Sequence, residues 1–125
     1  MDFATLKAQI ESARSVEVEA FGARFKVLLP SNYTCRVAIE THLDAQGRVV
    51  GARSSRAILD AAVTGWDGVT ASHFMPEAGD DPVAFSKAAL TELLDLRLDI
   101  SDRLTAGIAD KLDERRQRME AARKN

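Results

Sequence analysis

The chain has 125 residues, of which 46% are hydrophobic and 29% are charged, and its formal net charge at pH 7 is −2. These values fit one folded domain spanning 1–125, and they exclude a whole-chain electrostatic attraction to nucleic acid or anionic lipid. A single cysteine, Cys35, excludes an internal disulfide and favours a cytoplasmic location. We expect no signal peptide at the N-terminus, and no apolar run approaches the roughly 20 residues that span a bilayer.

The N-terminal quarter begins with a helical pattern that changes to alternation. Asp2 is a suitable N-cap for a helix over about 2–14, whose apolar residues Phe3, Leu6, Ile10 and Ala13 recur at helical spacing. Apolar residues then alternate with polar ones over 16–20 and again, less strictly, over 25–29. The intervening Gly22 predicts a hairpin between these two strands, and Pro30 ends the second strand.

The segment 33–43 carries two patterns at once. Its apolar residues alternate strictly, as in a strand, but several also share one helical face, and Ser31 or Asn32 could cap that helix. We favour the helix because Pro30 suits a strand-to-helix junction, although the β-branched residues of the segment favour a strand. Asp44–Gly47 is predicted to be a turn in either case.

The second half of the chain is predicted to be mainly helical. Ser54 or Ser55 would cap a helix that ends at Gly65 in a C-cap position. Residues 70–82 are rich in turn signals, and Ser86 then caps a helix with paired leucines. A last helix, opened by Asp99 or Ser101 and covering about 100–122, becomes highly charged after Leu112 and is expected to project from the body. The fold class expected is α+β, with an N-terminal helix, a small antiparallel sheet and a helical C-terminal half.

Residues that could support catalysis or metal binding are scarce. The chain has one cysteine and two histidines, His42 and His73, without a C-x-x-C or H-x-x-x-H pair. Cys35 and His42 lie seven residues apart, which is two helical turns and too far for a hydrogen bond. We therefore expect a protein that is not an enzyme and has no metal or cofactor.

The only tryptophan, Trp66, stands in the segment Gly65-Trp66-Asp67-Gly68-Val69. A tryptophan at the end of an element is more often a core residue than an exposed anchor, so we interpret Trp66 as a packing residue. Phe74 and Met75 follow in a turn-rich segment, where apolar side chains either fold back onto the core or form a binding patch.

The order of the segments around Trp66 resembles that of the small tail assembly chaperones of tailed bacteriophages and prophages. The resemblance covers about 56–125. It consists of Val63-Thr64-Gly65-Trp66-Asp67-Gly68-Val69, then Pro82-Val83-Ala84-Phe85-Ser86, then the helix with Leu93-Leu94, then a long charged helix. The insert 70–79 departs from the family, which often has a shorter Asp/Gly turn there.

The resemblance implies a non-catalytic factor in the host cytoplasm that binds tape measure protein and tail tube protein, with self-association. It also implies a frameshift near Lys124-Asn125 that yields a longer second protein. Candidate partner-binding residues are Phe74, Met75, Leu104, Ile108, Leu112, Arg115 and Arg116. A structural head–tail connector or tail completion protein is the first alternative. A nucleic-acid-binding accessory protein that uses the basic end of the last helix is the second, which the lack of interleaved aromatic residues disfavours.

Overall fold

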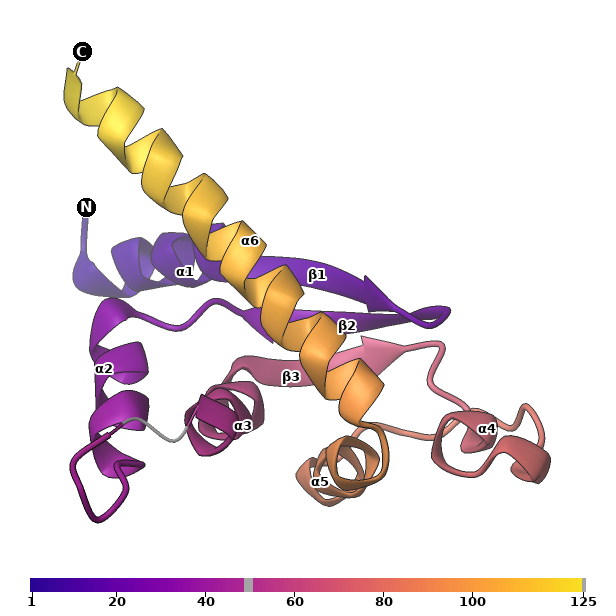
Figure 1. Ribbon diagram of the computed structural model, residues 1–125. Helices are drawn as coiled ribbons and strands as arrows, with labels where there is room; N and C mark the ends of the chain where they lie inside the picture. The colour runs from indigo at the N-terminus through magenta and orange to yellow at the C-terminus, as the bar shows by residue number, and fades with distance from the viewer. Residues whose placement is uncertain (49–50, 125) are drawn as a thin grey trace.

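The computed structural model describes residues 1–48 and 51–124, so Asn125 of the Lys124-Asn125 pair lies outside the described residues. Its elements in chain order are α1 (Phe3–Arg14), β1 (Ser15–Ala20), β2 (Ala23–Leu28), α2 (Asn32–Thr41), α3 (Gly51–Ala62), β3 (Val63–Asp67), α4 (Ala71–Phe74), the 3-10 helix η1 (Pro76–Ala78), α5 (Lys87–Leu96) and α6 (Leu98–Lys124) (Figure 1). The α+β class expected from the sequence is confirmed.

The sheet is antiparallel in the order β1-β2-β3, and its two faces differ in character. One face is buried against the helices and carries Val18, Ala20, Ala23, Phe25, Val27, Val63 and Trp66. The other face is exposed and carries charged residues such as Glu17, Glu19, Arg24 and Lys26. Because side chains alternate along a strand, the alternation of apolar and polar residues in β1 and most of β2 determines which face meets the core.

Helix α6 crosses the buried face of the sheet and supplies much of the core (Figure 1). Its residues Ile100, Leu104 and Ile108 are buried, as the helical spacing requires. At Gly107 the helix approaches β1 so closely that a Cβ atom there would lie 2.5 Å from Val18 Cγ1. The glycine therefore sets how near α6 sits to the sheet.

Helix α2 resolves the ambiguity of the segment 33–43 in favour of the helix. The hydroxyl of Ser31, its N-cap, accepts a hydrogen bond from the backbone N–H of Thr34 at 3.1 Å. Asp44–Gly47 forms the expected turn, in which the N–H of Gly47 donates to the carbonyl of Asp44 at 3.0 Å.

The boundaries predicted for the next helix are wrong at both ends. Helix α3 begins at Gly51, so the predicted caps Ser54 and Ser55 lie inside it. It ends at Ala62 and continues directly into β3, a strand that the sequence did not predict. Gly65 is a strand residue and not a C-cap, and the register of β3 on β2 shifts beside it, between Lys26 and Val27.

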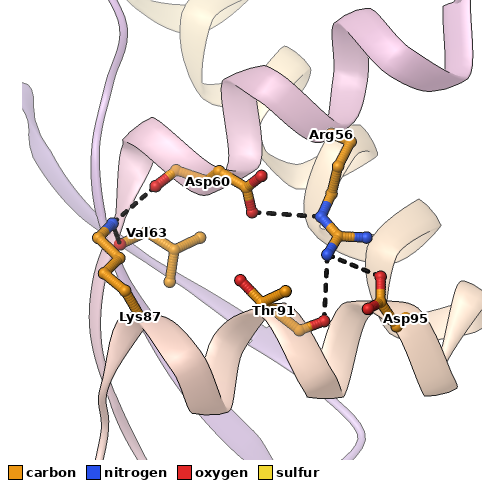
Figure 2. A network of polar contacts seen from close by, with 6 residues as sticks. All are labelled: Arg56, Asp60, Val63, Lys87, Thr91 and Asp95. Carbon is orange, nitrogen blue, oxygen red and sulfur yellow. Dashed lines mark hydrogen bonds and ion pairs between the residues drawn. The ribbon is translucent and has the colours of Figure 1, made fainter.

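A distant lysine takes the place of the expected glycine cap. Lys87 Nζ donates to the carbonyl oxygens of Asp60 and Val63, both at 2.7 Å, at the C-terminal end of α3 (Figure 2). The last carbonyls of a helix need such donors, and a cation suits the negative end of the helix dipole. Because Lys87 belongs to α5, no local pattern around α3 could have indicated it.

A second bridge joins the same two helices. Arg56 on α3 pairs with Asp60 at 3.2 Å and with Asp95 on α5 at 2.9 Å, and it donates to the carbonyl of Thr91 at 3.1 Å (Figure 2). The guanidinium thus satisfies three acceptors from two elements, which fixes the position of α5 against α3.

Two smaller differences concern the C-terminal half. The segment 70–82, predicted to be irregular, contains the short helices α4 and η1. Helix α6 opens at Leu98, slightly before the predicted Asp99 or Ser101, while Ser86 caps α5 as expected by accepting from the N–H of Ala89 at 3.0 Å.

Candidate partner-binding groove

Trp66 is a core residue, which confirms its interpretation from the sequence. Its side chain is 7% exposed, and its ring packs edge-on against Phe25 at 6.0 Å and Phe85 at 5.0 Å between centroids. The indole Nε1 donates to the carbonyl of Val83 at 2.8 Å. The tryptophan therefore clamps the segment 82–86 onto the end of β3, and the two short motifs that it joins form one structural unit.

The seven candidate partner-binding residues fall into three groups. Leu104 and Ile108 are buried in the core and are inaccessible to a partner. Phe74 is half-buried and packs against Trp66 at 6.4 Å, whereas the neighbouring Met75 is exposed. The remaining three line one groove, and they are Leu112, Arg115 and Arg116.

This groove lies between α1 and the C-terminal half of α6 and has a volume of about 1190 Å³. Ile10 and Arg14 line it from α1, and Leu29 to Asn32 line it from the segment after β2. Helix α6 supplies the other wall, with Ala109, Leu112, Asp113, Arg115, Arg116, Met119, Glu120, Ala122 and Arg123. In Figure 1 both α1 and the last turns of α6 extend away from the sheet on the same side.

Helix α1 is attached to the body at its C-terminal end. The backbone N–H of Leu29 donates to the carbonyl of Arg14, and Arg14 Nε donates back to the carbonyl of Leu29, both at 2.8 Å. From the opposite wall, Arg115 Nη1 donates to the carbonyl of Ala13 at 3.2 Å. These bonds hold the two walls of the groove in place at one end.

The apolar stripe of α1 faces solvent. The helix has no buried residue, and Phe3 is 72% exposed, Leu6 42% and Ile10 41%. The helical spacing in the sequence located this stripe, but the candidate partner-binding residues included none from α1. The sequence does show that the last helix becomes highly charged after Leu112, but nothing in it indicates that this half faces α1.

The N-terminus of α1 is stabilised by its own cap. The backbone N–H of Thr5 donates to Asp2 Oδ1 at 2.8 Å, and this hydrogen bond lowers the pKa of the Asp2 carboxyl. The carboxylate therefore remains ionised well into the acid range, and its charge also suits the positive end of the helix dipole.

The groove has an excess of positive charge. Four arginines line it, at positions 14, 115, 116 and 123, against the two carboxylates of Asp113 and Glu120. Both carboxylates pair with Arg116, at 2.8 Å and 2.9 Å. The hydrogen bond to Asp113 is the main cause that raises the pKa of Arg116. The charges of the other three arginines are thus available to a ligand.

A second cavity, of about 120 Å³, lies between α2, α3 and α6, and Cys35 lines it together with Ile58, Leu59 and Ile108. Burial raises the pKa of the Cys35 thiol, which leaves it protonated and a poor nucleophile at neutral pH. His42 is the C-cap residue of α2 and lies at the opposite end of that helix from Cys35. Across residues 1–48 and 51–124, no cluster of three or more potential metal ligands is present.

Comparison with known proteins finds no matching family model, no matching curated protein and no matching solved structure. Among the helices in the described part of the chain, none is both long and apolar enough to span a membrane. The geometry of the groove is therefore the main basis for a functional conclusion.

Proposed function

We propose that this protein is a non-catalytic assembly chaperone for phage tails, which binds tape measure protein, together with tail tube protein, in the host cytoplasm. The observation that carries the proposal is the exposed apolar stripe of α1, formed by Phe3, Leu6 and Ile10, beside an open groove. Soluble proteins rarely leave such surface uncovered unless a partner covers it.

Other exposed apolar side chains lie near the same end of the molecule. Helix α2 presents Tyr33, Val37 and Ile39, and Met119 is exposed on the last turns of α6. Figure 1 shows α1, α2 and the end of α6 on the same side. A helical client with a long apolar surface would be shielded by contacts of this kind, which are typical of helix-in-groove recognition.

The motif resemblance supports the proposal independently of the groove. Its two most distinctive segments meet at the hydrogen bond from Trp66 to the carbonyl of Val83. A motif whose parts pack on each other is expected to be retained for the fold, and related chaperones would share it for that reason. The resemblance thus concerns the scaffold, whereas binding depends on the groove.

The test is co-expression of this chain with the tape measure protein encoded by the same genome. We expect the soluble fraction of the tape measure protein to rise severalfold, the two proteins to co-purify, and the chain to be absent from mature particles. An unchanged soluble fraction would contradict the chaperone proposal. Stoichiometric presence in particles would favour a connector, and salt-sensitive DNA binding lost in Arg118→Ala would favour the nucleic-acid alternative.

A further inference from the structure

The dimensions of the groove match those of one short helix. The α6 wall from Ala109 to Arg123 measures about 21 Å. On the other side Ile10 and Arg14 line the groove, and the rest of α1, a helix of 12 residues or about 18 Å, continues beyond it. A helix of three turns is about 16 Å long, so it fits within the length of the α6 wall. The groove therefore suits a single helix of about three turns lying along α6, with one side facing the C-terminal part of α1.

The apolar groups of the two walls define the face that such a helix must present. Leu112 and Met119 are seven residues apart on α6 and share one face of it. Ile10 lies opposite, and Phe3 and Leu6 extend its stripe along α1. A ligand helix with apolar residues at i, i+3 or i+4, and i+7 would contact both stripes at once.

The charges of the groove determine which residues should flank the apolar face of the ligand helix. Arg14 and Arg115 donate hydrogen bonds to backbone carbonyls, which orient their guanidinium groups without neutralising them. Arg123 lines the same wall of α6. A second copy of this chain would bring an equally arginine-rich α6, so like charges oppose self-pairing through the groove. An acidic partner helix is complementary.

We propose that the groove between α1 and α6 binds about three turns, or roughly 12 residues, of a partner helix that has an apolar stripe flanked by aspartate or glutamate. The proposal rests on the function above only in naming tape measure protein as the natural source of that helix. Each bound copy then covers a segment of about 12 residues, so a long client requires many copies.

The binding test uses the full chain and labelled helical peptides with leucines at the spacing above and glutamates beside them. Fluorescence anisotropy should show affinity rising with peptide length up to about 12 residues and then levelling off. A matched peptide with lysines in place of the glutamates should bind at least about tenfold more weakly at low salt. Equal affinity of the two peptides, or no binding of either, would overturn the proposal.

Paired variants separate the groove from the rest of α6. Met119→Asn, inside the groove, should weaken binding of the acidic peptide about tenfold, whereas Gln117→Asn, on the same helix but outside the groove lining, should change it less than twofold. Arg123→Glu should reduce the preference for glutamate over lysine more than Arg118→Glu does. Circular dichroism confirms folding of each variant, and equal effects within a pair would contradict the assignment.

Two further outcomes distinguish this inference from the proposed function. If Met119→Asn keeps tape measure protein soluble as well as the unmodified chain does, the groove is not the site although the chaperone function stands. If the groove binds the acidic peptide but the chain has no effect on tape measure protein, the function is wrong and the site stands. A shift from oligomer to monomer on Met119→Asn would show that a second copy occupies the groove.

Discussion

At the scale of single residues, Phe21 is the one non-glycine residue with a positive φ in the described chain. It occupies the first corner of the two-residue turn between β1 and β2 with a φ of 50°, and Gly22 follows with a φ of 81°. Asn-Gly suits such a turn far better than a bulky residue does. We expect Phe21→Asn to raise the free energy of unfolding by about 0.5–1 kcal/mol in urea denaturation.

A control variant separates the backbone effect from the contacts of the ring. The Arg97 guanidinium lies 5.4 Å from the centroid of the Phe21 ring, an attraction worth about 0.5–1 kcal/mol at an exposed site. Phe21→Leu removes this contact but keeps the strain, so it should destabilise the protein. If Phe21→Asn were also destabilising, the ring contact would outweigh the backbone strain.

The carbonyl of Phe21 accepts a hydrogen bond from His73, which belongs to the turn-rich segment 70–82. Thr70 N–H donates to His73 Nδ1 at 3.1 Å, so the neutral ring carries its proton on Nε2 and donates it to the Phe21 carbonyl at 2.8 Å. These two positions are 52 residues apart. Sequence patterns report neighbours in an element, and they could not predict this pairing or the cap that Lys87 supplies to α3.

At the scale of elements, the packing of α6 on β1 depends on Gly107. Alanine normally stabilises a helix interior by about 1 kcal/mol relative to glycine. Here its Cβ would lie 2.5 Å from Val18 Cγ1, and overpacking of this kind costs typically 1–3 kcal/mol. We expect Gly107→Ala to lower the free energy of unfolding by about 1 kcal/mol in denaturant titration.

The same substitution should change sign once the facing side chain is shortened. Val18→Ala removes the methyl groups that collide with the new Cβ, so Gly107→Ala in that background should stabilise the protein by up to about 1 kcal/mol. A double-mutant cycle measures this coupling directly. Additive effects of the two substitutions would mean that α6 does not depend on close approach at Gly107.

Elements with a complete local signature were predictable. Helix α5 has a serine cap and a leucine pair, and the hairpin has alternation on both sides of Gly22, so each could be located from its own residues. Strand β3 was not predicted because its five residues contain a glycine and follow a helix without a break. The groove could not be predicted from the sequence for a different reason. It lies between α1 and α6, and neither helix defines it alone.

At the scale of the whole molecule, the buried core and the groove occupy different parts of the same long helix. The core residues of α6 end at Ile108, and the residues after Leu112 have no buried side chain within the described range. The buried core therefore uses the first half of α6, and the proposed binding uses the second. Helix α1 contributes no side chain to the buried core. It is joined to the body at its C-terminal end by the hydrogen bonds between Arg14 and Leu29.

Removal of 113–124 tests this separation. The truncated chain keeps the buried stripe of α6 but loses Met119, Arg123 and the hydrogen bond from Arg115 to the carbonyl of Ala13. That bond is worth about 0.5–1.5 kcal/mol, so the urea midpoint should fall only slightly. Binding of the acidic peptide should be abolished in the anisotropy assay. A loss of cooperative unfolding would show that the last turns belong to the folding unit, and retained binding would place the partner site elsewhere.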